Sequence, residues 1–460
     1  MKNFANDWVI RILIYFFIAT SILMFLYTFY RSEIVYNGKE FNHYLKYYLA
    51  FGLGAVFWFI VLFLKKNIRF NIVLTITTFI ICLYTIEFFL KISRFAHYSE
   101  SYVVAKKEGI DFDLRSDFEV YKDLKKLKTK VFPAVHSNMF LDKKNDKNSI
   151  YPIGGISKST IVHCNESGTY SIYLSDRYGF NNPDSEWNSK ETDWLLTGDS
   201  YAHGACVNPG EDIGSQIRTM TGDSVINLGT RGNGPLIELS SLIEYGKFQK
   251  PKKVLWTYYE GNDFINLNEE KSTIFINYLR SDYFQNLMNR QEEVDIKVME
   301  KIETILSNSY NPILLKTSFL RLYETRFFIQ KRFKKICVVN EKSKVYFFCE
   351  EKSNIDYFKN IDLFEKIILK AKNLTNDWGG ELYFVYLPEY ERYALKIEDH
   401  SSYKKREQVI NLVKKLNIPV IDIHKEFFSK VEDPLSYFPF RLKGHYTKEG
   451  YKAVANVLIK

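Results

Sequence analysis

Three long apolar runs within the first 94 residues constrain this chain more than any other feature of its sequence. Residues 8–30 are apolar for about 20 positions, the length that a helix needs to cross the roughly 30 Å hydrocarbon core of a bilayer. Two further runs, 48–64 and 70–90, follow. No small-x-small cleavage site follows Tyr30, so the first run is not typical of a signal peptide. We expect three membrane helices, the alternative being one anchor and a buried apolar hairpin.

The short connection between the second and third runs orients these helices. It carries Lys65, Lys66 and Arg69 and no acidic residue, and cations in short loops are retained on the cytoplasmic side. The pattern predicts a cytoplasmic N-terminus and an extracytoplasmic chain after about residue 95, facing the periplasm if the membrane is a bacterial inner membrane. Five cations oppose this orientation: Arg31, Lys39, Lys46, Lys91 and Arg94.

From residue 193 onward, short apolar runs alternate with amphipathic ones. Strands are expected at 194–197, 224–228, 254–259, 381–387 and 418–423, and helices at 212–220, 235–248, 361–374, 404–416 and 447–458. Continuous apolar strands between amphipathic helices indicate an α/β fold, in which a parallel sheet is sandwiched by helices in a flavodoxin-like three-layer arrangement.

The remaining segments give five expected parts. Before the alternation, a charged helix is expected at 118–130 and short strands at 159–163 and 170–174. Residues 266–360 are too many for a loop and contain a charged helix at 292–306 and a basic-aromatic stretch from Phe319 onward. The parts are a membrane domain (1–94), a linker and accessory segment (95–190), a first core part (191–265), a helical insertion that is a possible lid (266–360) and a second core part (361–460).

Four motifs follow the expected strands or precede the last helix. They are Gly198-Asp199-Ser200, residues 227–234 (Asn-Leu-Gly-Thr-Arg-Gly-Asn-Gly), residues 260–263 (Glu-Gly-Asn-Asp) and residues 444–451 (Gly-His-Tyr-Thr-Lys-Glu-Gly-Tyr). Since the carboxyl ends of parallel strands meet at one sheet edge, the motifs should converge there. They supply a nucleophile, a glycine N–H, an amide side chain and an imidazole, which acyl transfer through a serine ester requires.

In these motifs the sequence resembles the SGNH, or GDSL, hydrolase superfamily over residues 191–265 and 361–460. The resemblance implies that Ser200 is the nucleophile and that His445 is the general base. It also implies an oxyanion hole made by the Ser200 N–H, Gly232 and Asn262. It implies neither a cofactor nor a metal, and no cysteine or histidine spacing in the chain is typical of zinc.

One position departs from the family pattern. The family usually has Asp three residues before the histidine, where it orients the ring, and this chain has Leu442 there. We expect either a backbone carbonyl or another acid such as Asp433 to hold His445, and a degenerate, non-catalytic domain is the alternative. His203, one helical turn after Ser200, is the rival base, and we interpret it as a pocket residue.

Three further observations lead to expectations. Glu260 is expected to have a surface or hydrogen-bonded role, and Cys206 to serve packing. Cys337 and Cys349 flank an expected hairpin, and an extracytoplasmic location would allow them to form a disulfide.

The expected function is a membrane-anchored serine esterase that removes acyl groups, O-acetyl above all, from an extracytoplasmic glycan or a lipid-linked substrate. An O-acyltransferase using the same acyl-enzyme, a lysophospholipase and an inactive glycan-binding or assembly subunit are the alternatives. The formal net charge of +9 is modest for 460 residues and is no nucleic-acid footprint. The expected partners are therefore the lipid bilayer and the acylated substrate, not nucleic acid.

Overall fold

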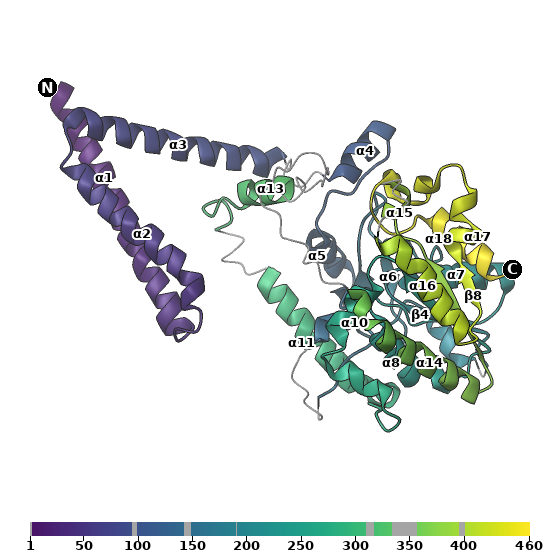
Figure 1. The fold of residues 1–460 in the computed structure, drawn as a ribbon. Helices are drawn as coiled ribbons and strands as arrows, with labels where there is room; N and C mark the ends of the chain where they lie inside the picture. Colours follow the sequence, from purple (N-terminus) through teal and green to yellow (C-terminus); the bar gives the residue numbers. More distant parts are fainter. Residues whose placement is uncertain are drawn as a thin grey trace. The chain divides into compact units, whose positions relative to one another are not determined.

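A computed structural model describes residues 2–93, 99–141, 149–189, 191–309, 317–333, 357–394 and 401–460 (Figure 1). The chain divides into two compact units. The first, here called the membrane unit, comprises residues 1–96 and 313–348. The second, here called the sheet unit, comprises residues 97–312 and 349–460.

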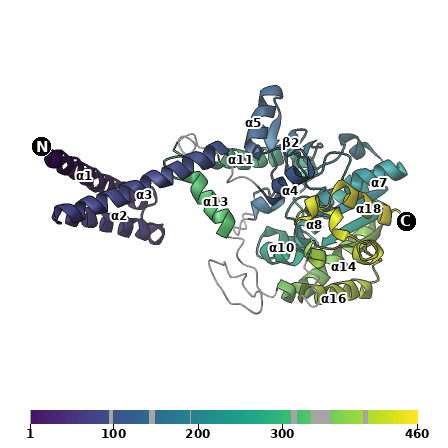
Figure 2. The ribbon, with the colours of Figure 1, turned by 90° about the horizontal axis from the view of Figure 1, so that it is seen from above.

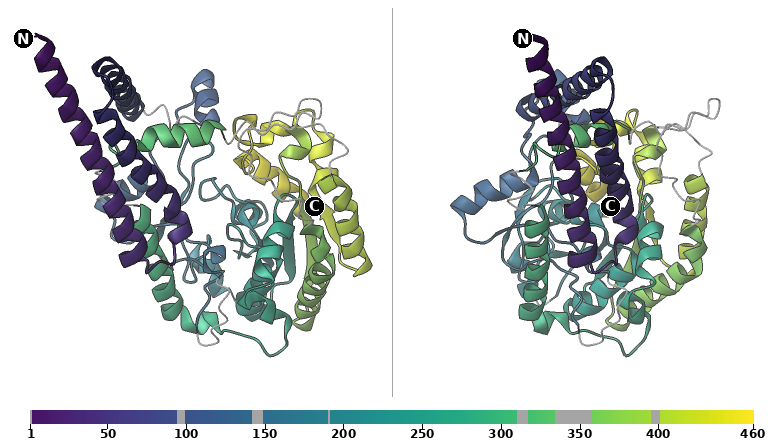
Figure 3. Two further views of the ribbon diagram at one scale, coloured as in Figure 1. Left: turned by 60° about the vertical axis from the view of Figure 1, so that its left-hand side comes forward. Right: turned by 90° about the vertical axis from the view of Figure 1, so that its left-hand side faces the viewer.

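Three long helices, close to the expected ranges, dominate the membrane unit. They are α1 (Lys2–Phe29), which continues as a π-helix (Tyr30–Val35), α2 (Phe41–Leu62) and α3 (Lys66–Ser93). All three are long and apolar enough to cross a membrane, and most of their apolar side chains are exposed to the surroundings. Both views in Figure 3 show α1, in purple, running alongside α2. An apolar exposed surface of this kind indicates membrane association.

A partly buried ion pair joins the beginning of α1 to the beginning of α3. Arg69 pairs with Asp7 and also donates a hydrogen bond to the carbonyl oxygen of Leu62 at 3.0 Å. Arg69 is therefore held by partners within the membrane unit. The pair holds the start of α1 beside the α2–α3 connection, so both lie at the same end of the helices.

A second buried carboxylate joins α3 to the basic-aromatic helix. This helix, α13 (Tyr323–Phe333), begins at the side chain of Glu87, which accepts the backbone N–H groups of Glu324 at 3.0 Å and Thr325 at 2.8 Å. A carboxylate at a helix N-terminus satisfies orphan donors and complements the helix dipole. The helix α13 therefore groups with the three long apolar helices, whereas the charged helix α11 (Gln291–Ser309) belongs to the sheet unit.

The sheet unit is built on a parallel five-stranded sheet, as expected. Its strands in the described residues are β4 (Trp194–Gly198), β5 (Val225–Asn227), β6 (Lys253–Tyr259), β7 (Glu381–Leu387) and β8 (Val420–Asp422). Their order is β5-β4-β6-β7-β8, the doubly wound 2-1-3-4-5 order. The direction of winding reverses between β4 and β6, where such sheets bind ligands beyond the carboxyl ends of the strands.

Helices cover both faces of this sheet. Leu195 of β4 packs in one apolar core and its neighbour Leu196 in another, because successive side chains of a strand point to opposite faces. The first core is closed by α8 (Pro235–Ser241), α14 (Ile361–Asp377) and α16 (Ser401–Lys415), and the second by α7 (Ile213–Thr221) and α18 (Lys448–Leu458). Figures 1 and 2 both show α14 and α16 side by side.

A small mixed sheet precedes the main one. It has the order β1-β2-β3, with β1 (Val131–Pro133) parallel to β2 (Thr160–Val162) and β3 (Ile172–Leu174) antiparallel to β2. The charged helix α5 (Asp117–Leu127) packs against β1. The expected helix and both expected strands are therefore present, although each is shorter than the range expected from the sequence.

The loop after β3 joins this accessory region to the main sheet. The buried carboxylate of Asp176 accepts four hydrogen bonds, from the N–H groups of Tyr178 and Phe180 and the side chains of Asn182 and Trp187. Asn182 in turn pairs with both backbone groups of Asn227 on edge strand β5, at 2.8 and 2.9 Å. The accessory region thus covers an otherwise unpaired sheet edge.

Candidate active site

Ser200 lies where β4 ends and the short helix α6 (Ser200–His203) begins. The preceding residue, Asp199, caps this helix by accepting the Tyr201 N–H at 2.8 Å. The strand–turn–helix geometry puts the Ser200 hydroxyl at the carboxyl edge of the sheet, beside the switch point between β4 and β6.

His445 lies in the loop before α18 and contacts Ser200 directly. Its Nε2 is 2.9 Å from the Ser200 Oγ, a hydrogen-bonding distance. Tyr201 supports this loop, because its hydroxyl donates to the Gly444 carbonyl at 3.1 Å and its ring lies 4.9 Å from the imidazole. The structure therefore brings together the two residues that the motifs proposed as nucleophile and base.

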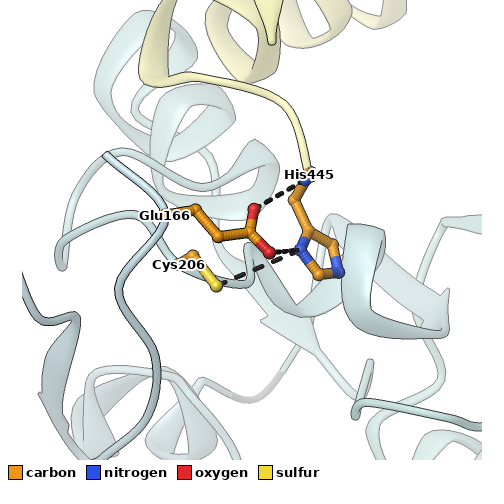
Figure 4. Close-up of side chains that lie close together, drawn as sticks. All are labelled: Glu166, Cys206 and His445. Carbon is orange, nitrogen blue, oxygen red and sulfur yellow. Dashed lines mark hydrogen bonds and ion pairs between the residues drawn. The ribbon is translucent and has the colours of Figure 1, made fainter. Parts of the chain in front are cut away.

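Glu166 completes a hydrogen-bonded triad with these two residues, and Figure 4 shows its contact with His445. One carboxylate oxygen is 2.9 Å from His445 Nδ1, and the other accepts the His445 backbone N–H at 2.7 Å. Burial acts to raise the pKa of Glu166, but the hydrogen bonds and the charge of His445 outweigh it, so the pKa lies below its usual value. An ionised carboxylate in this position fixes the ring orientation and stabilises imidazolium.

The local sequence explains how Glu166 reaches His445. Glu166 lies in the turn between β2 and β3, where Asn165 accepts the Gly168 N–H at 2.8 Å and donates to the Asp113 carbonyl at 3.1 Å. On the other side, a Cβ at Gly444 would lie only 2.8 Å from a Glu166 oxygen. The glycine of the Gly-His pair thus makes room for the acid.

This arrangement decides between the two expectations for the group that holds His445: another acid does so, but it is Glu166 and not Asp433. A backbone carbonyl does not hold Nδ1, and Asp433 pairs instead with Arg441 at an exposed position. The acid is not supplied from the neighbourhood of Leu442. It comes from a position 279 residues before His445 in the chain. No motif of the family places an acid at the position of Glu166. The feature nearest to it in the sequence is Cys164, two residues earlier.

A disulfide between Cys164 and Cys206 ties the Glu166 turn to the segment that follows α6. Its Cα atoms are 5.0 Å apart, and Cys206 Sγ lies 4.0 Å from His445 Nδ1 (Figure 4). The expectation that Cys206 serves only packing is therefore wrong. The expected pair of Cys337 and Cys349 lies outside the described residues.

The same three side chains are close enough together to hold a metal ion. The ligand atoms of Glu166, Cys206 and His445 lie within 4.8 Å of one another. A metal ligand sulfur must be a thiolate, however, and the sulfur of Cys206 is bonded to Cys164. The donor set therefore fits a catalytic acid and base better than a metal centre.

Two other candidates for acid–base work have different partners. His203 packs with its ring 4.7 Å from that of His163 and 5.2 Å from that of Tyr173, and burial together with the charge of His445 lowers its pKa to about 4. Glu260 accepts the Arg392 Nε at 2.9 Å, which confirms a hydrogen-bonded role. Neither residue contacts Ser200 in the part of the chain described.

Of the two further oxyanion candidates, Asn262 contacts the Ser200 turn through Asp199, and Gly232 lies against Asn138. A hydrogen bond from Asn262 and one from the Tyr201 N–H act on Asp199, whose pKa burial nevertheless raises to about 6. Gly232 adopts a left-handed backbone with φ of 76°, and a Cβ there would lie 2.1 Å from Asn138 Nδ2. Glycine is thus required at position 232 for both its conformation and its neighbour.

No protein-family model matches the chain, and no curated protein matches it.

Replacing Glu166 by Gln should lower ester turnover by roughly 10²–10⁴-fold, because the imidazolium loses its counter-charge and one of the two His445 donors loses an acceptor. Asp433→Asn is the matched control and should change turnover less than about twofold, since it removes only an exposed ion pair. The measurement is steady-state hydrolysis of an aryl acetate by the full-length protein. Equal turnover of Glu166→Gln and wild type would exclude Glu166 from the triad.

Replacing both Cys164 and Cys206 by Ser should lower the free energy of unfolding by about 3–4 kcal/mol, the effect of opening a loop of intermediate length. Turnover should fall as well, because the tether two residues before Glu166 is lost. Thermal unfolding and aryl acetate hydrolysis measure the two effects, with Cys82→Ser as the control. A double variant with wild-type turnover would mean that Glu166 stays in place without the disulfide.

Proposed function

We propose that this chain is a membrane-anchored serine esterase of the SGNH, or GDSL, type that removes acyl groups from a glycan. One observation carries the proposal: the continuous hydrogen-bonded chain Ser200–His445–Glu166 at the switch point of a doubly wound sheet. The family resemblance of the four motifs supports the same activity, and it rests on those motifs alone.

The chemistry follows from the atoms in contact. His445 Nε2 accepts the proton of the Ser200 hydroxyl as its Oγ attacks the ester carbonyl, and Glu166 stabilises the resulting imidazolium. Collapse of the tetrahedral intermediate breaks the ester C–O bond, and His445 returns the proton to the leaving alcohol. Water that gives a proton to the same imidazole then attacks the acyl-Ser200 ester. The bond between the acyl carbon and Oγ breaks, His445 returns the proton to Ser200, and the carboxylic acid is released.

The developing oxyanion needs preorganised donors, and the proposal assigns this role to three groups. They are the Ser200 N–H at the beginning of α6, the Gly232 N–H and the side chain of Asn262. The Gly232 N–H has no acceptor among the described residues, which leaves it available for substrate. Such donors typically contribute 10²–10³-fold each to turnover, on the order of 3–4 kcal/mol.

A complete triad also bears on the alternative of an inactive glycan-binding subunit. Leu442 suggested a degenerate site because it removes the usual acid. Glu166 occupies the place of that acid through two hydrogen bonds, so the main sequence argument for lost activity no longer applies. The geometry favours turnover over binding alone.

The proposed location is extracytoplasmic, with O-acetyl groups of an envelope glycan as the substrate. The cations Lys65 and Lys66 in the short α2–α3 connection favour a cytoplasmic position for that connection. The Cys164–Cys206 disulfide supports the same orientation, because disulfides persist in oxidising compartments outside the cytoplasm. The membrane anchor and the family resemblance support the choice of an envelope glycan.

A serine-reactive fluorophosphonate should label the full-length protein, and labelling should disappear in Ser200→Ala. His445→Ala should lower both labelling rate and aryl acetate hydrolysis by on the order of 10³-fold or more, because nucleophile and base act as a unit. His203→Ala is the matched control and should keep most of the activity. A folded wild-type protein that is neither labelled nor active would refute the esterase proposal, and loss in His203→Ala alone would reassign the base.

Fusion of reporters at residue 95 should give active alkaline phosphatase and a dark cytoplasmic fluorescent protein, if three spans begin inside. As a control, the same reporters fused between Lys65 and Lys66 should give the opposite pattern, because that connection is retained in the cytoplasm. Alkaline phosphatase that is inactive at residue 95 and active at residue 65 would invert the orientation, and would make the substrate a cytoplasmic ester.

A further inference from the structure

The loop that carries Gly232 also carries a cation that the proposed reaction does not use. Arg231 is exposed and has no hydrogen bond or ion pair with any described residue. It precedes Gly232 directly, and its charge acts on Glu166, lowering the pKa of that carboxyl. An unpaired guanidinium next to an active site is a ready partner for a planar anion such as a carboxylate, or for a phosphate.

Arg231 lines a cavity of about 510 Å³ within the sheet unit, which we call the Arg231 pocket. Its wall includes Asn138, His136 and His163, together with the aromatic rings of Phe118 and Tyr121. This volume falls in the range of small-molecule sites, roughly 300–1,000 Å³, and such sites combine apolar walls with a few placed polar groups. Asn138 lies against Gly232, so the pocket adjoins the proposed oxyanion hole.

Two polar atoms in the wall of the Arg231 pocket lack partners. The His163 ring is buried, with 7% of the residue exposed, and its Nε2 has no hydrogen bond among the described residues. The Oδ1 of Asn138 is also buried without a described partner. A buried polar atom without a partner carries a desolvation cost that a bound ligand relieves, so both atoms indicate a place for ligand hydroxyl groups.

The charge balance of the pocket depends on Arg231. Burial lowers the pKa of His136 to about 3 and that of His163 well below its usual value, so both rings are neutral at neutral pH. Among the lining residues, Asp117 is the one carboxylate, and it is exposed at the beginning of α5. Arg231 is the one arginine or lysine in the lining. A ligand anion in the pocket would therefore pair with this guanidinium.

We propose that the Arg231 pocket binds an anionic group, a carboxylate or a phosphate, on the sugar whose ester is cleaved at Ser200. The inference rests on the proposed esterase function and names its substrate class as an acidic, acylated sugar. Arg231 supplies the charge, the rings of Phe118 and Tyr121 supply faces for the sugar C–H groups, and Asn138 and His163 supply partners for its hydroxyls.

Three mono-O-acetylated methyl glycosides test the proposal on the full-length protein: galactoside as the neutral ester, galacturonoside as the carboxylate and galactoside 6-phosphate as the phosphate. The wild type should cleave at least one anionic ester with a kcat/KM about 10-fold or more above that of the neutral ester. Arg231→Gln should lower this ratio about 10-fold or more, chiefly through KM, and Arg231→Lys should restore part of it. Arg280→Gln, which removes an exposed arginine elsewhere, should leave the ratio unchanged.

Calorimetric binding of the unacetylated glycosides separates this inference from the esterase proposal. Binding of the uronide or the phosphate that is lost in Arg231→Gln, in a protein that cleaves no ester, would support the pocket and refute the esterase. Cleavage of all three esters at equal rates, or a preference that Arg231→Gln retains, would overturn the pocket. Preference for one anionic ester over the other identifies whether the group is a carboxylate or a phosphate.

Discussion

The two hydrogen bonds between Glu166 and His445 hold the site together. One fixes the imidazole through Nδ1 and the other fixes the backbone of the loop that carries it, so a single carboxylate determines both the position and the orientation of the ring. This contact depends on the hairpin turn that presents Glu166, on the glycine at 444 that leaves room for it, and on the disulfide that anchors the turn. The acid of the triad is thus provided by the small sheet and not by the main one.

Local patterns in the sequence were sufficient for most of the fold. The strands of the parallel sheet were predictable because each is a short apolar run between amphipathic helices, and the three long apolar helices because of their length and composition. The proximity of Ser200 and His445 was predictable because each lies in a motif directly beside such an element. In each case the information is contained within short continuous segments of the chain.

Glu166 and the Cys164–Cys206 disulfide were not predictable in this way. They depend on how a hairpin from the accessory region packs against two distant loops, and no periodicity or spacing specifies that packing. The same reason explains the pairing of Arg69 with Asp7. In the sequence, Arg69 is recognisable only as one of three cations near a short connection. The same reason also explains Glu87, which caps a helix more than 200 residues later in the chain. Contacts between distant segments decide these roles.

The disulfide has a chemical consequence for the active site beyond holding Glu166. Without Cys164, residue 206 would be a free thiol 4.0 Å from the imidazole of His445. A thiol beside a histidine readily becomes a thiolate, which is a stronger nucleophile than a serine hydroxyl and is easily oxidised. By consuming this sulfur, the accessory hairpin keeps the imidazole available to Ser200 alone and makes the site resistant to the oxidants of the environment in which we propose that it works.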